Sequence, residues 1–169
     1  MDDVEHHKKT ERRALSFADL RYPSVLYACG LGSGLMPRAP GTWGSVLGVA
    51  LWFALVGHLS LPWLGALLAA VFVLSLVAIR SMQQRFGVMD APEIVIDEIL
   101  GVWIALLFAP LLWWTALLGF AAFRLFDIWK PWPVSWADRM HTPVGVMLDD
   151  VIAGVMALVV VQVALLLIL

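Results

Sequence analysis

Charged residues are missing from most of this 169-residue chain. Every Lys, Arg, Asp and Glu falls in one of four stretches, residues 1–38, 80–98, 124–139 and 149–150. Charged residues make up 14% of the sequence and hydrophobic residues 62%, whereas an average soluble domain is about 25% charged. A soluble domain of this length could not bury so much apolar surface. The composition therefore excludes an ordinary soluble protein and predicts an integral membrane protein.

Cysteine is nearly absent, and the first residues lack the apolar core of a signal peptide. Cys29 is the single cysteine, so no intramolecular disulfide can form. Residues 1–22 are polar and of mixed charge, without an apolar h-region. We predict a polar cytosolic N-terminal segment over residues 1–22 and one membrane-embedded domain over residues 23–169.

The long stretches without charge predict an all-α membrane bundle. A spanning helix needs about 20 mostly apolar residues. Pro110 divides the longest apolar stretch, which favours two short helices that turn at the far side of the membrane, with one kinked helix as the alternative. About five membrane-embedded segments are then expected, over residues 43–59, 62–80, 98–109, 112–127 and 151–169.

The positions of the basic residues orient this arrangement. With five segments, all eleven Lys and Arg residues lie on one side, and the opposite turns contain none. The positive-inside rule makes that side the cytoplasm. The same arrangement brings three acidic clusters to the cytoplasmic face, namely Asp97-Glu98, Asp127 and Asp149-Asp150.

A loop rich in glycine and proline is expected over residues 30–45, because both residue types disfavour a helix. Thr42 stands at the N-cap position of the helix expected from residue 43. Backbone N–H groups at a helix N-terminus bind anions. One interpretation is a phosphate cradle with Thr42, Ser45 and Arg38 near the ligand. An equally weighted alternative is a loop that only shapes the bundle.

The acidic clusters offer oxygen ligands. Asp97 and Glu98 are consecutive and point about 100° apart on a helix. We therefore expect one of them to bind an ion, and the other to orient it, cap the helix or bind a second ion. Asp149 and Asp150 stand just before the last apolar stretch. Carboxylates at helix starts are also favoured by the helix dipole alone, so a purely structural role is the alternative.

Arg124, Asp127 and Lys130 recur at every third residue, which places them on one helical face. A carboxylate near a helix C-terminus needs a cation, which Arg124, Lys130 or a metal ion could supply. Basic side chains beside carboxylates also suit a bound phosphate. A structural ladder of ion pairs is the alternative.

Four motifs together carry a resemblance to a known family: GSGLMPRAPGTWGS, IVIDEILG, FRLFDIWKPWP and GVMLDDVIAG. In this order and spacing, over about residues 22–158, the chain resembles the phosphatidylglycerophosphatase A family. The resemblance implies a magnesium-dependent phosphatase of the bacterial inner membrane. Its substrate would be phosphatidylglycerophosphate, its products phosphatidylglycerol and phosphate, and its active site would face the cytoplasm.

This resemblance and the preference of Mg²⁺ for carboxylate oxygens assign expected roles. The catalytic and metal-binding residues would be Asp97, Glu98, Asp127, Asp149 and Asp150. The phosphate-binding residues would be Arg124, Lys130, Thr42, Ser45 and Arg38. The nucleophile is left open between water and an aspartate, and so is the oligomeric state.

The expected partners are the lipid substrate and the surrounding membrane lipids. No nucleic-acid partner is expected. The competing function is a small membrane transporter or ion carrier with acidic sites at the cytoplasmic edge. Such a carrier should place an ionisable group near a helix midpoint, whereas the centres of the expected helices carry no charge.

Overall fold

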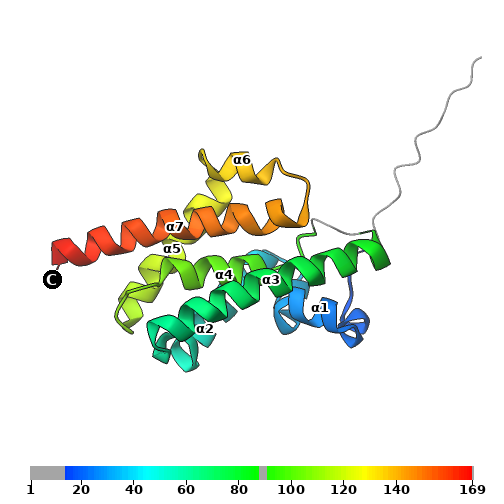
Figure 1. Cartoon of the computed structure of the whole chain (residues 1–169), viewed down its shortest axis with the longest axis horizontal. Coiled ribbons are helices and arrows are strands. Elements are labelled where there is room, and N and C mark those ends of the chain that lie inside the picture. The colour runs from blue at the N-terminus through cyan, green and yellow to red at the C-terminus, as the bar shows by residue number, and fades with distance from the viewer. Residues whose placement is uncertain (1–13, 88–90, 169) are drawn as a thin grey trace, which may run out of the picture.

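The computed structural model describes residues 14–87 and 91–168, and over these ranges the protein is helical without any strand (Figure 1). The elements in chain order are η1 Phe17–Arg21, α1 Pro23–Ala28, η2 Gly30–Leu35, α2 Pro40–Ala54, η3 Val56–His58, α3 Leu61–Phe86, α4 Ile96–Ala105, α5 Trp113–Trp129, α6 Val134–Asp138 and α7 Pro143–Ile168. The predicted all-α class is confirmed.

The predicted N-terminal segment is described only from residue 14 onward, and residues 1–13 lie outside the described part. Within residues 14–22, the side chains of Leu15 and Asp19 are buried. Asp19 accepts hydrogen bonds from the backbone N–H and the hydroxyl of Ser16, 3.0 and 2.8 Å long, which fix the start of η1. This part of the segment therefore folds against the domain.

Three helical segments are long and apolar enough to cross a membrane: Pro40–His58, Leu61–Phe86 and Pro143–Ile168. The other two expected segments are present as separate helices, so Pro110 does mark a turn between α4 and α5 rather than a kink. However, α4 has 10 residues and α5 has 17, or about 15 and 25 Å of helix. Helices thus lie at all five expected places, and three helical segments have the length of a span, while five membrane crossings stay a prediction.

Helix α4 occupies the centre of the bundle, between α7 on one side and α2 and α3 on the other (Figure 1). Nine of its ten residues are buried. Close contact with α2 depends on glycine, because a Cβ at Gly44 would lie 2.5 Å from the Val95 side chain and one at Gly48 would lie 3.3 Å from Ile99 Cα. The Trp103 indole N–H donates a 2.8 Å hydrogen bond to the Gly48 carbonyl across this contact.

Helix α7 approaches α4 just as closely, again at glycines. A Cβ on Gly154 would lie 2.5 Å from the carbonyl oxygen of Gly101, and a Cβ on Gly101 would lie 2.9 Å from the carbonyl oxygen of Asp150. The two backbones are therefore in direct contact, as small residues allow in membrane bundles. Asp97 precedes Gly101, and Asp150 precedes Gly154, by one helical turn each. The crossing thus brings these two carboxylates together.

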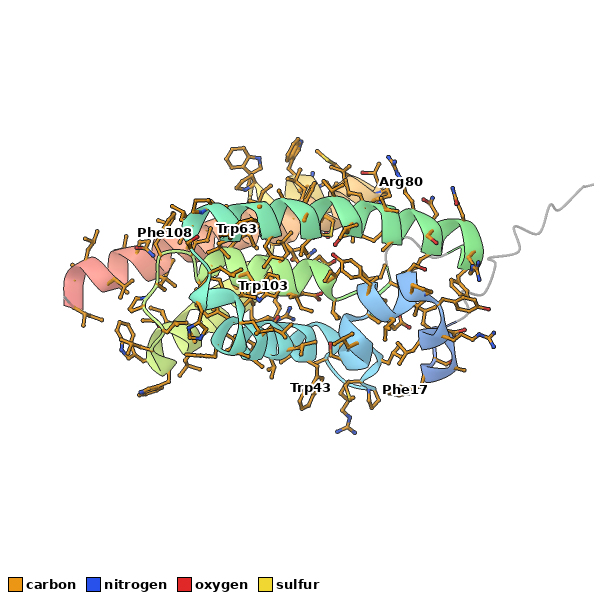
Figure 2. All side chains as sticks on the ribbon, turned by 60° about the horizontal axis from the view of Figure 1, so that its bottom comes forward. Phe17, Trp43, Trp63, Arg80, Trp103 and Phe108 are labelled. Atoms are coloured by element: carbon orange, nitrogen blue, oxygen red, sulfur yellow. The ribbon has the colours of Figure 1, made fainter. Side chains whose placement is uncertain are left out.

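The outer surface of the bundle carries large apolar side chains. Exposed residues include Val73 and Val77 of α3 and Val159 and Val163 of α7, whereas α7 turns glycine and alanine inward. This distribution suits a hydrocarbon surrounding. Figure 2 shows Trp63 and Phe108 near one end of the bundle and Arg80 toward the other.

Several helix boundaries differ from the sequence prediction. Helix α2 begins at Pro40 rather than at residue 43, α3 continues beyond Arg80 to Phe86, and α7 begins at Pro143 rather than at residue 151. As a consequence, Asp149 and Asp150 lie about two turns inside α7 and not at its start.

Candidate active site

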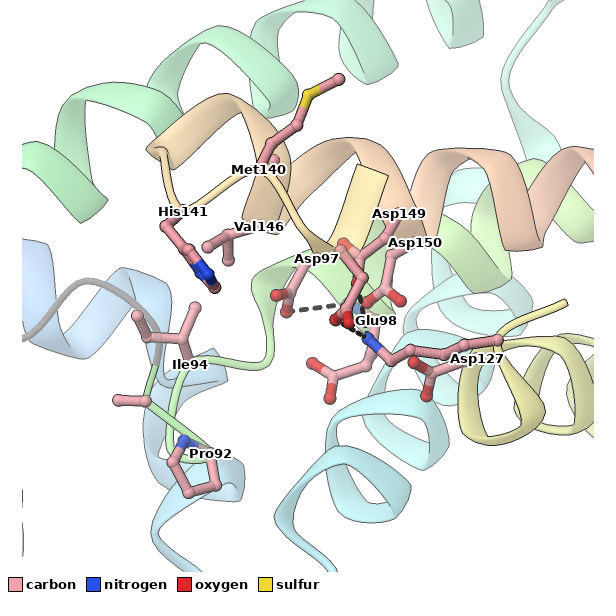
Figure 3. A pocket seen from close by; sticks show the side chains of 14 residues that line it. Pro92, Ile94, Asp97, Glu98, Asp127, Met140, His141, Val146, Asp149 and Asp150 are labelled. Carbon is pink, nitrogen blue, oxygen red and sulfur yellow. Dashed lines mark hydrogen bonds and ion pairs between the residues drawn. The ribbon is translucent and has the colours of Figure 1, made fainter. Parts of the chain in front are cut away.

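The five predicted acidic residues line one pocket, at the end of the bundle where α4 and α7 begin and α5 ends (Figure 3). Helix α4 contributes Asp97 and Glu98, α5 contributes Asp127, and α7 contributes Asp149 and Asp150. The cavity has a volume of about 120 Å³, enough for several water molecules. Segments far apart in the sequence thus meet as expected.

Three of the carboxylates form a tight group. Asp97, Glu98 and Asp150 each offer an oxygen, and these oxygens lie within 4.8 Å of one another. Oxygens of both Asp97 and Glu98 belong to this group, so the geometry allows both residues to face one ion, and which of them binds a metal stays a prediction. Both residues lie in the first turn of α4, where the Asp97 carboxylate folds back to accept the Glu98 backbone N–H at 3.0 Å.

Two carboxylate oxygens in this pocket are buried without a hydrogen-bond partner, Glu98 Oε2 and Asp149 Oδ1. A buried acceptor left unsatisfied is costly, and buried carboxylates are normally paired or bound to a metal. The pocket wall carries six carboxyl side chains, since Asp138 also lines it, and among the described residues Lys130 is the one Lys or Arg in that wall. The site therefore has an excess of negative charge that a cation would offset.

The same crowding appears in the pKa values of the α4 carboxyl groups. Burial raises the pKa of Asp97 well above its ordinary range, and the charge of Glu98 adds to the effect. Burial also raises the pKa of Glu98 to about 8, which its hydrogen bond with Asp97 opposes and the charge of Asp150 reinforces. Both carboxyl groups are thus held in surroundings that disfavour the bare anion.

Arg124 lies beside the pocket on α5. Its Nη1 is 2.5 Å from Asp127 Oδ2 and 4.0 Å from Glu98 Oε1. Its Nε is buried and has no hydrogen-bond partner. Arg124 therefore links the acids of two helices and keeps one donor unused.

Lys130 ends α5 in the left-handed conformation, with φ of 48°. Its Nζ donates to Asp149 Oδ2 at 2.7 Å and also pairs with Asp138 of α6. Burial alone would lower the pKa of Lys130, but these two ion pairs more than offset it, so the pKa lies above the ordinary lysine value. Lys130 is therefore charged, and it joins α5, α6 and α7 at the pocket.

The expected phosphate-cradle residues lie outside the pocket wall. Ser45 is fully buried, and its hydroxyl donates a 2.8 Å hydrogen bond to the Gly41 carbonyl within α2. Thr42 lies in the first turn of α2, whose N-cap is Ala39, so the N-cap prediction for Thr42 is wrong. Arg38 is exposed. The nearest part of α2 is Gly41, where a Cβ would collide with the Glu98 carboxylate and lie 3.0 Å from Arg124 Nη1.

The predicted site did not include two polar residues of the pocket wall, Asp138 and His141. Both belong to the segment from α6 to α7 that covers one side of the cavity (Figure 3). No spacing pattern in the sequence connects these two residues with the five predicted acidic residues. The available signal was their position between two helices whose acidic residues were already expected to converge.

Comparison with known proteins gives a consistent result. The sequence model of the family described as Phosphatidylglycerophosphatase A matches residues 26–165. A protein named phosphatidylglycerophosphatase A from Escherichia coli is 36% identical over 161 residues, which cover 93% of this chain and 90% of the relative. A protein of the same name from Haemophilus influenzae is 40% identical over 154 residues, covering 90% and 94%.

A third relative, from Bacteroides thetaiotaomicron, is provisionally named a phosphatidylinositol-3-phosphatase. It is 40% identical over 147 residues, covering 83% of this chain and 92% of the relative. No solved structure matches the chain significantly.

Proposed function

Since this chain belongs to the phosphatidylglycerophosphatase A family, we propose that its acidic pocket hydrolyses phosphatidylglycerophosphate to phosphatidylglycerol and phosphate with Mg²⁺. The observation that carries the proposal is the meeting of five carboxylates from three helices, two of whose oxygens have no partner. These helices also carry the apolar surface of a membrane protein. The substrate has its phosphate at the membrane surface and its acyl chains in the hydrocarbon.

The residues of the pocket fit a magnesium ion. Mg²⁺ prefers carboxylate oxygens, keeps several waters and bridges to substrate phosphates. Asp97, Glu98 and Asp150 would hold the first ion, and the free oxygen of Asp149 and the carboxylate of Asp127 would serve a second ion or its waters. When bound, the metal would supply charge stabilisation for the phosphoryl oxygens and the leaving oxygen.

The basic residues then serve the substrate phosphate. Lys130, in the pocket wall, and the unused donor of Arg124, beside it, would bind phosphate oxygens. Hydrolysis breaks the bond between phosphorus and the terminal glycerol oxygen. The oxygen of water ends in the released phosphate, and a proton goes to the glycerol oxygen. The attacking atom is a water oxygen, or an aspartate oxygen whose acyl phosphate water then cleaves.

We place the pocket at the cytoplasmic surface of the bacterial inner membrane. The turns at the opposite end of the bundle, residues 55–60 and 106–112, contain no Lys or Arg, whereas Arg124, Lys130 and Arg139 lie at or near the pocket end. The positive-inside rule supports this orientation. Exposed Trp129 and Trp132, also near the pocket, suit the headgroup level of the membrane.

The direct test is phosphate release from phosphatidylglycerophosphate by the purified full-length chain in lipid nanodiscs. We expect release with Mg²⁺, loss of release with EDTA, and recovery when Mg²⁺ is restored. Phosphatidylinositol 3-phosphate should be included as a second substrate, because one relative carries that activity in its name. A helical, folded protein that releases no phosphate from phosphatidylglycerophosphate with Mg²⁺ present would overturn the assignment.

Lys130→Gln should mainly weaken substrate binding. The variant removes one charged hydrogen bond, worth about 1.5–3 kcal/mol, so KM should rise about tenfold or more while kcat changes little. Steady-state kinetics on the same nanodiscs would measure both constants. Arg139→Gln is the matched control, because Arg139 is exposed and lies outside the pocket wall. An unchanged KM in Lys130→Gln would limit Lys130 to joining the helices.

A further inference from the structure

An apolar groove runs along the outside of the bundle between α2 and α5. Val46, Val49 and Phe53 of α2 and Trp113, Leu117 and Phe120 of α5 line it, and we call it the α2/α5 groove. Its volume is about 380 Å³. The exposed fractions of Val46, Leu117 and Trp113 are 44%, 59% and 74%, so the groove opens to the surroundings of the protein.

The groove leads toward the acidic pocket. Its two helices continue past Val46 and Phe120 to Gly41 and Arg124 at the pocket end, where a Cβ on Gly41 would lie 3.0 Å from Arg124 Nη1. Arg124 follows Phe120 by one helical turn. From the level of Arg124 to that of Trp113 the distance along α5 is about 17 Å, close to half of the ~30 Å hydrocarbon thickness of a bilayer. The path from Arg124 through the α2/α5 groove to Trp113 thus has about the length of one acyl chain in one leaflet, and it is apolar beyond Arg124.

Arg124 adds a polar end to this apolar path. Its Nη1 is committed to Asp127, but its buried Nε has no partner. An unsatisfied buried N–H is costly, and a phosphate oxygen is a strong acceptor for it. A ligand that fits both features has a phosphate at one end and a long hydrocarbon chain at the other.

We propose that the α2/α5 groove binds one acyl chain of the lipid substrate, with the Arg124 Nε–H donating to the phosphate-bearing headgroup at its end. The inference rests on the proposed function, because it takes the substrate to be a phosphorylated lipid. It adds that the substrate enters sideways from the membrane between α2 and α5. Recognition of the lipid then includes its chain as well as its phosphate.

Filling the groove tests the proposal. Val49→Trp and Val46→Trp place bulk in it from α2, and Val77→Trp places the same bulk on the exposed face of α3, away from the groove. Each variant is assayed on long-chain phosphatidylglycerophosphate and on its deacylated, water-soluble headgroup. We expect the two groove variants to raise KM for the long-chain lipid about tenfold and to leave the soluble substrate within twofold, with Val77→Trp unchanged on both.

A second measurement does not depend on turnover. A non-hydrolysable phosphatidylglycerophosphate analogue with a photoreactive acyl chain should label peptides of α2 and α5 more than α3, and unlabelled substrate should compete. Equal labelling of α3 without competition would mean bulk lipid only and would overturn the proposal. The proposal would also be overturned if the groove held a second copy of the chain. That outcome would be detected as a dimer that Val49→Trp dissociates.

The kinetic outcomes also separate the two proposals. Wild-type protein that cleaves neither substrate contradicts the proposed function, while the labelling result still decides the groove. Active wild type with an unchanged KM for long-chain lipid in both groove variants contradicts the groove alone. Equal loss on both substrates means that the substitution distorts the pocket, and this result also counts against a chain-binding groove.

Discussion

Asp150→Asn should lower Mg²⁺-supported phosphate release by at least about a hundredfold. Asp150 is buried, groups with Asp97 and Glu98 within 4.8 Å, and belongs to the helix that crosses α4 in direct backbone contact. Even residues that only orient metal ligands typically affect metal affinity or activity 10–100-fold when replaced. Asparagine keeps the shape and loses the charge. Phosphate release in nanodiscs over a range of Mg²⁺ concentrations would measure the effect.

Thermal unfolding provides the second readout for this variant. Without Mg²⁺, Asp150→Asn should be at least as stable as the wild type, because it removes one charge from a crowded, buried set. Saturating Mg²⁺ should stabilise the wild type by about 2.7 kcal/mol at one hundred times Kd and the variant much less. Asp138→Asn is the comparison, since Asp138 lines the pocket outside the tight group and should lose less than about tenfold in activity. Wild-type activity and a wild-type response to Mg²⁺ in Asp150→Asn would remove Asp150 from the site.

Gly154→Val should destabilise the protein by about 1–3 kcal/mol and reduce activity at least tenfold. A Cβ on Gly154 would stand 2.5 Å from a backbone oxygen of α4, which cannot rotate out of the way. The helices must then separate, and the separation moves Asp150 from Asp97 and Glu98. Unfolding in detergent, followed by circular dichroism, and phosphate release would report the two effects.

The matched control is Gly65→Val on α3. Gly65 also lies inside a helix of apolar residues, but nothing is within 4 Å of a Cβ placed there. Its valine variant should keep activity and stability near the wild type. If Gly154→Val behaved like Gly65→Val, close helix contact would not be what assembles the acidic group.

The sequence predicted the helical class, the break near Pro110 and the meeting of the acidic clusters. These follow from hydropathy, from proline and from the return of every charged stretch to one side. The start of α7 was wrong because Asp149 and Asp150 look like residues that flank a membrane segment. A local signal was present, since Thr142 caps the Gly145 N–H at 3.1 Å and Pro143 opens the helix.

Other parts of the site depend on packing that spacing does not encode. The contact of Gly101 with Gly154 joins residues 53 positions apart, and many glycines in this chain could have served it. The same holds for Lys130, whose pairing with both Asp138 and Asp149 depends on the left-handed turn at the end of α5. Pro40 at the first position of α2 was the missed signal for the early start of that helix. With this start, Ser45 lies inside the helix and is buried.

The ten-residue length of α4 has a consequence for how the chain enters the membrane during synthesis. In the proposed topology a helix of this length is too short to insert alone, and α4 and α5 would enter together as a hairpin, with the turn at residues 106–112 leading. The charged residues at the two ends of that hairpin then stay on the side from which it enters. Charges are costly to move across hydrocarbon. In that topology the charged residues that α4 and α5 contribute to the pocket would reach it without crossing the bilayer.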